Sequence, residues 1–176
     1  MTGNELQYCG QILKKDAELR AFLESQRLIE PPNAKLWFAY LASVKDIQGN
    51  ISNSLGFVAT LLAKEYLAAR FNLIHFDAAE KAQGAPGPDI EARTVDGQSI
   101  RCEIKTTRPY QPGFGAQQKV KIKEDLKKLI NSPANYKIMF VTDADAFKTL
   151  CKRYYSEYAR GIEVVNLITS ETYCHV

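Results

Sequence analysis

The sequence predicts a single α/β domain with a helical N-terminal extension. Two observations lead to this fold class. Apolar residues recur at helical spacing through most of the first 70 residues. Beyond them, short runs rich in β-branched and aromatic residues alternate with turn signals and further helical patterns. The length of 176 residues and the apolar fraction of 45% suit one domain with a sizeable core.

The N-terminal extension is expected to hold two helices. The first spans residues 4–28 and is ended by Pro31-Pro32. The second spans about 34–46, and its aromatic residues are interpreted as helix core. These are Trp37, Phe38 and Tyr40.

A third helix begins after a loop that offers Ser52 or Asn53 as an N-cap and runs to about Arg70. Apolar residues at spacings of three and four predict its buried stripe. The stripe consists of Leu55, Val58, Leu62, Glu65 and Ala69. A buried carboxylate needs a partner or a metal, so Glu65 is a candidate functional residue.

The rest of the chain reads as strand, hairpin, helix, strand, helix and strand. The predicted ranges are 73–76, 88–106, 117–131, 136–142, 143–159 and 163–168. No internal repeat or domain boundary interrupts this order. We therefore predict one domain, in which residues 1–50 form the extension, 53–142 the core, and 143–176 a C-terminal helix and strand.

The sequence distinguishes between two possible registers of the hairpin. A two-residue turn at Asp96-Gly97 would pair Ile90 with Glu103. A three-residue loop of 95–97, with Gly97 in the left-handed conformation, pairs Asp89 with Glu103 and keeps the apolar residues on one face. We predict the three-residue loop.

This register places two acidic residues and a lysine together. Glu103 and Lys105 share one face of their strand, opposite to Cys102 and Ile104. Carboxylate oxygens beside a lysine suit Mg²⁺ and a phosphodiester. Together, Pro88-Asp89 and Glu103-Ile104-Lys105 on adjacent strands indicate a nuclease. The alternative is a solvated strand face with a cross-strand ion pair.

These two motifs and the order of the elements resemble the PD-(D/E)xK nuclease superfamily. That superfamily includes type II restriction enzymes, archaeal Holliday-junction resolvases and repair endonucleases. The resemblance implies a restriction-endonuclease-like three-layer core, with a central mixed β-sheet flanked by helices. It also implies that Asp89, Glu103 and the Ile104 carbonyl hold Mg²⁺, for which Mn²⁺ can substitute. Lys105 would then orient or deprotonate the attacking water. Glu65 resembles the additional acid that many members take from the helix before the first strand, although a salt bridge would also explain it.

Basic residues gather after the predicted site. From Lys105 to Lys128 there are seven Lys or Arg against Glu124 and Asp125, a net charge of +5, although the whole chain carries only +3. We interpret this stretch as a phosphate-contacting surface, and the alternative is a solvated helix face. The candidate nucleic-acid contacts are Arg108, Tyr110, Gln117, Gln118, Lys119, Lys121 and Lys123.

Two of these residues bear on the branch of the superfamily. Gln117 or Gln118 stands where some members carry a functional glutamine. The RecB-like branch has a tyrosine four residues later, where this chain has Lys121 and Ile122. That difference argues against the RecB-like branch.

The composition and the apolar pattern indicate the cellular environment of the protein. No apolar run approaches the ~20 residues of a membrane helix, and the polar start of the chain is not typical of a signal peptide. Four scattered cysteines predict reduced thiols and a cytoplasmic protein without structural zinc.

The expectation is a Mg²⁺-dependent endonuclease acting on double-stranded DNA, of restriction type. We expect it to be a homodimer, with the N-terminal helices able to supply the dimer surface. The alternatives are a Holliday-junction or repair nuclease of the same fold, a non-catalytic DNA-binding module, and an interaction module.

Overall fold

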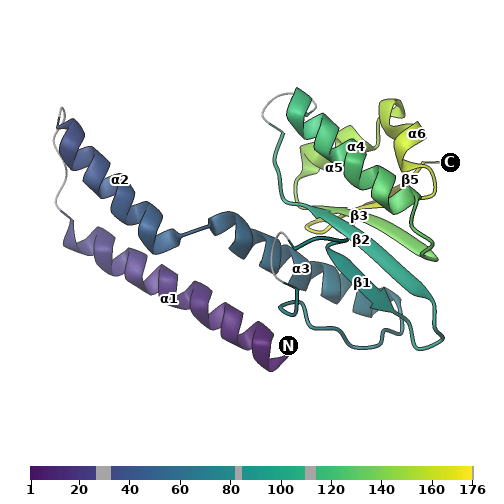
Figure 1. The fold of residues 1–176 in the computed structure, drawn as a ribbon, viewed down its shortest axis with the longest axis horizontal. Coiled ribbons are helices and arrows are strands. Elements are labelled where there is room, and N and C mark those ends of the chain that lie inside the picture. Colours follow the sequence, from purple (N-terminus) through teal and green to yellow (C-terminus); the bar gives the residue numbers. More distant parts are fainter. Residues whose placement is uncertain (27–32, 82–84, 110–113, 176) are drawn as a thin grey trace.

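The computed structural model describes residues 1–26, 33–81, 85–109 and 114–175. It contains one mixed five-stranded sheet with the strand order β1-β2-β3-β4-β5 (Figure 1). The strands are β1 Ile90–Arg93, β2 Ser99–Lys105, β3 Tyr136–Val141, β4 Glu163–Asn166 and β5 Thr172–Cys174. The three central strands are parallel, and each edge strand is antiparallel to its neighbour. The chain is therefore an α/β protein, as its sequence predicts.

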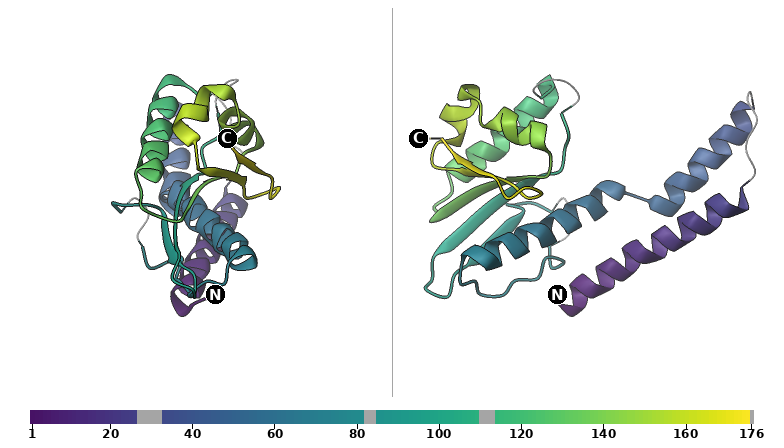
Figure 2. Two further views of the ribbon diagram at one scale, coloured as in Figure 1. Left: turned by 90° about the vertical axis from the view of Figure 1, so that its right-hand side faces the viewer. Right: turned by 180° about the vertical axis from the view of Figure 1, so that it is seen from behind.

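Helices cover both faces of the sheet (Figure 2). On one face, α3 (Ile51–Arg70) packs through Ala59, Ala63 and Leu67. On the other face, α4 (Ala116–Ile130) and α5 (Ala144–Leu150) pack over Met139 and Val164 of the central strands. Each face thus buries its own hydrophobic cluster, and the site described below lies under α4.

The predicted buried stripe of α3 is wrong. Leu55, Val58 and Glu65 are exposed, whereas the buried positions are Phe57, Ala59, Thr60, Ala63 and Leu67. Alanines at 59 and 63 let the helix lie close to the sheet, which larger side chains would prevent. Of the residues expected to be buried, Leu62 packs partly against the cluster on the sheet, whereas Leu55, Val58, Glu65 and Ala69 are exposed.

The first two helices form an antiparallel hairpin that projects from the sheet (Figures 1 and 2). They are α1 (Gly3–Ser25) and α2 (Ala34–Gln48), close to the predicted ranges, while Pro31-Pro32 lies outside the described residues. Trp37 and Phe38 are 40% and 77% exposed, so interpreting them as helix core is wrong.

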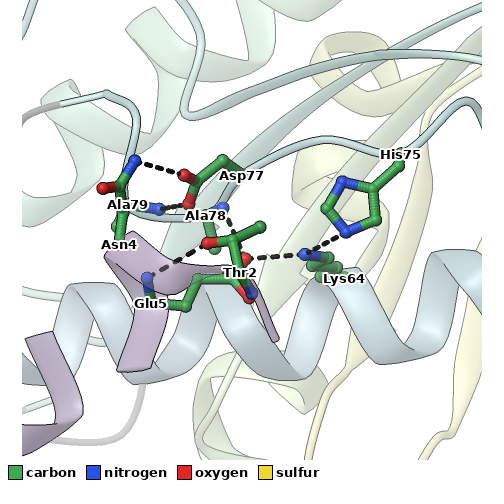
Figure 3. Close-up of polar contacts among 8 residues, drawn as sticks. All are labelled: Thr2, Asn4, Glu5, Lys64, His75, Asp77, Ala78 and Ala79. Atoms are coloured by element: carbon green, nitrogen blue, oxygen red, sulfur yellow. Dashed lines mark hydrogen bonds and ion pairs between the residues drawn. The ribbon is translucent and has the colours of Figure 1, made fainter. Parts of the chain in front are cut away.

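Glu5 links the start of α1 to α3 and to the loop that follows α3 (Figure 3). This carboxylate is fully buried and accepts hydrogen bonds from Lys64 Nζ at 2.6 Å and from the Ala78 amide at 2.8 Å. Thr2 and Glu5 also form a capping box at the start of the helix. Because Lys64 belongs to α3 and Ala78 to the loop that follows it, Glu5 joins three segments of the chain.

The predicted strand 73–76 is reduced to a single bridge between Leu73 and Thr94. The chain then leaves the sheet edge, because His75 contacts Lys64 Nζ at 3.4 Å and Ala78 bonds to Glu5. The loop made by 75–79 therefore belongs to the anchor of α1.

The C-terminal part differs from the prediction in two ways. The expected helix 143–159 is divided into α5, a short 3₁₀ helix Arg153–Tyr155 and α6 (Ser156–Ala159). The extended backbone of Lys152 breaks the helix, and Tyr155 turns into the core beside Phe114. Strand β5 has no counterpart in the prediction.

The hairpin register is confirmed. Ile90 pairs with Cys102 and Ala92 with Ile100, as the three-residue loop requires. Gly97 has a φ of 86°, and the Thr94 amide donates to the Gln98 carbonyl at 2.9 Å across the base of the loop. This register positions Asp89 opposite Glu103.

Two further expectations from the sequence concern membrane-spanning helices and the state of the cysteines. No helix in the described ranges combines the length and apolar character needed to cross a membrane. All four cysteines lie within the described residues and are free thiols.

Candidate active site

Asp89 lies just before β1 and directs its carboxylate at the neighbouring strand. Its Oδ2 accepts a hydrogen bond of 2.7 Å from the Ile104 amide. A strand residue points its N–H and C=O to the same edge, so the Ile104 carbonyl also faces the Asp89 side of β2. The next residue follows this alternation, because the Lys105 carbonyl accepts a hydrogen bond of 3.3 Å from the Thr142 amide on the opposite edge of β2. Asp89 and the Ile104 carbonyl can therefore share one ligand.

Glu103 is buried beneath α4, with a side chain only 4% exposed. Its Oε1 is buried without a hydrogen-bond partner among the described residues. Burial, followed by the negative charges of Asp89 and Asp125, raises the pKa of Glu103 to about 7, although Lys128 and Lys105 partly oppose the shift. A buried carboxylate oxygen without a partner costs free energy, and a bound cation would remove that cost.

Lys105 lies on the same face of β2 as Glu103, at the end of the strand. Its ammonium forms an ion pair with Asp125 of α4. Asp125 is 6% exposed and also accepts a hydrogen bond of 2.8 Å from Lys128 Nζ. The structure thus brings together three carboxylates and two lysines, from the start of β1, from β2 and from α4.

Asp125 and Lys128 are the members of this cluster that the sequence prediction misses. The signal is present: Asp125 falls between Ile122 and Leu129, at helical spacing from both, in the stripe that packs on the sheet. Asp125 is therefore a carboxylate in an apolar helical stripe, which is the pattern that Glu65 shows in the sequence of α3. Its partner, Lys105, is 20 residues away in the sequence and becomes a neighbour only in the folded chain.

Glu65 does not join the site. Its side chain is exposed on α3, which covers the face of the sheet opposite to α4. Within the described ranges, no group of three or more His, Cys, Asp and Glu side chains is arranged to hold a metal ion. The predicted ligand set differs from such a group, because it has two carboxylates, of Asp89 and Glu103, and a backbone carbonyl.

Helix geometry divides the basic residues of α4 into two sets. Lys121, Asp125 and Lys128 are spaced by four and three residues, so they share the side next to Glu103. Lys119 and Lys123 lie on the opposite side of the helix. Lys123 Nζ is 4.3 Å from the ring centroid of Tyr158 and 4.6 Å from that of Tyr154. Hydrogen bonding to these tyrosines raises the pKa of Lys123. This lysine is thus held by aromatic rings rather than placed at the site.

The remaining candidates surround the start of α4. Arg108 is largely exposed, and its Nε lies 3.7 Å from Asp143 Oδ2. Gln118 caps its own helix, because its Oε1 accepts from the Gly115 amide at 3.0 Å, and Gln117 is exposed. Tyr110 lies outside the described residues. A capping role accounts for Gln118 without a ligand.

A cleft of about 430 Å³ opens beside Asp89 on the α3 side of the sheet. Among the described residues, its charged lining consists of the ammonium of Lys81 and four carboxylates, those of Asp77, Glu80, Asp89 and Glu91. An anionic substrate is disfavoured there. The side of the sheet near Lys105, Lys121 and Lys128 suits a phosphate better.

The chain was compared with models of protein families, with curated proteins and with solved structures. None of the three comparisons found a match.

Proposed function

We propose that this protein is a Mg²⁺-dependent DNA endonuclease of the PD-(D/E)xK type. The observation that carries the proposal is the hairpin register. It sets Asp89, directly before edge strand β1, opposite Glu103 of β2. Glu103 and Lys105 then lie on one face, as the Glu-x-Lys spacing requires.

The residues fit a divalent cation. Asp89 and Glu103 supply carboxylate oxygens, and the Ile104 carbonyl points to the same edge as Asp89. Glu103 Oε1 is buried and has no hydrogen-bond partner in the described part of the chain, and this observation favours such a ligand. The chemistry that Mg²⁺ would supply here is neutralisation of phosphate charge and activation of water.

The other charged residues have distinct tasks in this proposal. Lys105 stabilises the charge that develops on the phosphate and orients the attacking water. Asp125 fixes the Lys105 ammonium, so this side chain is positioned before the substrate arrives. Lys128 balances the second oxygen of Asp125 and, with Lys121, extends positive charge along the exposed side of α4.

The substrate in this proposal is double-stranded DNA, the location is the cytoplasm and the enzyme is of restriction type. The α4 side offers the cationic surface for the DNA backbone. A Holliday-junction or repair nuclease would use the same cluster of residues and would differ in the substrate it accepts.

The test is cleavage of plasmid, linear and four-way-junction DNA with Mg²⁺ or Mn²⁺. The key variant is Asp89→Ala, and the matched control is Asp96→Ala, which removes an exposed acid from the tip of the same hairpin. We expect metal-dependent cutting that Asp89→Ala loses and Asp96→Ala keeps. Discrete fragments support the restriction branch, and selective junction cutting supports a resolvase.

Absence of cutting by folded wild-type protein on every substrate would reject the endonuclease. Calorimetry with Mg²⁺ then separates the remaining alternatives. Metal uptake that depends on Glu103 would indicate a binding module that has kept the site, and no uptake would indicate a cluster of charged residues with a structural role only.

A further inference from the structure

A second cleft, of about 510 Å³, lies across the strands β1 and β2 at the end of β2 away from Lys105. We name it the β1–β2 cleft. Its described lining comes from both strands, from the loop that follows α4 and from the segment that leaves the outer edge of β1. These lining segments are 74–76, 91–93, 99–101 and 132–134. Its volume lies in the range of about 300–1,000 Å³ that is usual for ligand sites.

The β1–β2 cleft lies on the face of the sheet that carries the candidate active site. Ala92 and Ile100 pack with α3 in the hydrophobic cluster on the other face. Because strand side chains alternate between the two faces, Arg93 and Arg101 lie on the side opposite to α3, together with Glu103. The cleft and the candidate active site are therefore neighbours along one surface.

The distance between them follows from the register. We call Asp89 and Glu103 the acidic pair. The next pair on this face is Glu91 with Arg101, and the pair after that contains Arg93. At about 3.3 Å per strand residue, Arg93 lies about 13 Å along the strand from Asp89. One strand of B-DNA advances about 3.4 Å per nucleotide along the helix axis, so this distance corresponds to about four nucleotides.

The charge of the β1–β2 cleft suits an anion. Among the described residues, its charged lining consists of the guanidinium groups of Arg93 and Arg101 and the carboxylate of Glu91, beside the imidazole of His75. Arg93 is exposed, and no ion pair of the described residues includes it. A guanidinium group can donate two parallel hydrogen bonds to a phosphate. The cleft beside Asp89, by contrast, is lined mainly by carboxylates.

Arg101 is held by an ion pair that a phosphate can replace. Its guanidinium group contacts the carboxylate of Glu91, and the two side chains are 29% and 64% exposed, respectively. An ion pair with so exposed an acid contributes little to stability. Glu91 can therefore turn into solvent when a phosphate binds Arg101, and it competes with that phosphate.

The wall of the cleft beyond α4 is fixed by polar contacts within the chain. The amide and the hydroxyl of Ser99 both donate to Asn135 Oδ1, at 2.9 and 3.0 Å. Ser132 Oγ accepts from the Ala134 amide at 3.2 Å. The cleft is thus formed before a ligand arrives, which favours binding.

Helix α4 runs antiparallel to β2, and this direction sets the order of the positive charges. Asp125 of α4 pairs with Lys105 at the end of β2. The Ile130 carbonyl at the end of α4 accepts from Lys137, which lies beside the start of β2. Lys121, one turn before Asp125, therefore lies beyond Lys105, and the arginines of the cleft lie at the other end. The acidic pair lies between these two groups of cations.

We infer that the β1–β2 cleft binds a phosphate of the DNA strand, about four nucleotides from the scissile phosphate, through Arg93 and Arg101. The position relative to the scissile phosphate rests on the proposed function. A strand held by α4 at one end and by this cleft at the other presents the phosphate between them to the acidic pair. The cleft is thus a second contact for the substrate backbone, separate from the cations of α4.

The test is fluorescence anisotropy of a labelled DNA duplex with the full chain in the absence of metal, so that binding is measured without cleavage. Arg93→Gln combined with Arg101→Gln should raise the Kd roughly eightfold near 0.1 M salt. The slope of log K against log salt should become shallower by about 0.9, which is the effect of one lost phosphate contact. Arg93→Gln alone should change both quantities in the same direction.

Glu91→Gln should have the opposite effect and lower the Kd, because it removes the competitor of the phosphate. The control is Arg160→Gln, which matches the charge change of Arg93→Gln. Arg160 is exposed and bridges to His175 beside β5, at the opposite edge of the sheet, so this variant should bind DNA like the wild type. Because Glu91 and Arg93 are exposed, circular dichroism should show an unchanged fold for their variants.

The inference would be overturned by a Kd and a salt slope that Arg93→Gln and the double variant share with the wild type. A wild type that does not bind the duplex would overturn it as well. A Glu91→Gln variant that binds DNA more weakly would also contradict it, because Glu91 would then hold Arg101 in place for the ligand instead of competing with it.

Failure of this inference and failure of the proposed function are separate results. A protein that binds DNA through this cleft and cuts no substrate would reject the endonuclease and retain the phosphate site. A protein that cuts DNA, but whose arginine variants bind like the wild type, would reject the phosphate site and retain the endonuclease.

Discussion

Replacing Glu103 by glutamine should change how the stability of the protein depends on pH. Burial and the charges of Asp89 and Asp125 raise the pKa of Glu103 from 4.5 to about 7. The folded protein therefore binds this proton more tightly than the unfolded chain does. The stabilising contribution is complete below the unfolded pKa and is lost as the pH rises through the folded pKa.

The magnitude follows from the shift. At about 1.4 kcal/mol per pKa unit, the raised pKa makes ionised Glu103 cost roughly 3 kcal/mol of unfolding free energy above neutral pH. Glu103→Gln keeps the shape and removes the charge. We expect this variant to be more stable than the wild type by up to about 3 kcal/mol near pH 8, and to lose most of that advantage near pH 5.

Urea unfolding of the metal-free protein across this pH range is the assay. Glu65→Gln is the matched control, because its side chain is exposed on the other face and should leave the pH profile unchanged. Equal pH profiles for the wild type and Glu103→Gln would refute the reasoning about Glu103. Adding Mg²⁺ at ten times its Kd should stabilise the wild type near pH 8 by about 1.4 kcal/mol, and should stabilise Glu103→Gln less.

Asp125→Asn should release Lys105 and Lys128 and destabilise the fold by about 1–3 kcal/mol. The proposed DNA cleavage should fall in this variant, and unchanged cleavage would contradict the positioning role of Asp125. Glu5→Gln should loosen α1. Burial opposes the shift, but hydrogen bonds from Lys64 and Ala78 lower the pKa of Glu5. The stability from Glu5 is therefore present above the unfolded pKa and lost as the pH falls through the folded pKa, which acid titration of the wild type and Glu5→Gln will check. Gly97→Ala should cost about 1–2 kcal/mol because of its left-handed backbone, whereas Gly10→Ala in helix α1 should stabilise by about 0.5–1 kcal/mol; thermal unfolding measures both.

The local parts of the fold and site were predictable from the sequence. The register of the hairpin follows from Asp96-Gly97 and from the alternation of apolar residues on either side of it. Those cues act over a few residues and agree with one another, so the pairing of Ile90 with Cys102 is confirmed.

The face that α3 turns to the sheet could not be predicted in the same way. The helix carries two apolar stripes, one through Leu55 and Val58 and one through Ala59 and Ala63. The choice between them depends on the close approach of small residues to the sheet and on the docking of α1 through Glu5 and Lys64. Those contacts are distant in the sequence and leave no periodic signal.

The residues of the candidate site likewise include some that a local sequence motif predicts and others that depend on contacts distant in the sequence. Asp89, Glu103 and Lys105 follow from a short motif on two adjacent strands. Asp125 sits in an apolar stripe, which hints at burial, but its ion pair with Lys105 requires α4 to lie across β2. Strand β5 is three exposed residues long and has no sequence pattern that distinguishes it from a loop.

The hydrogen bond between the Ile104 amide and Asp89 has a practical consequence for spectroscopy. The Ile104 amide donates to the carboxylate of Asp89 rather than to a backbone carbonyl, because β1 begins only after Asp89. Its proton chemical shift and its rate of exchange with solvent therefore depend on the charge and position of one carboxylate. A ¹⁵N-labelled sample would allow a single backbone resonance to report the state of Asp89 during a titration without substrate.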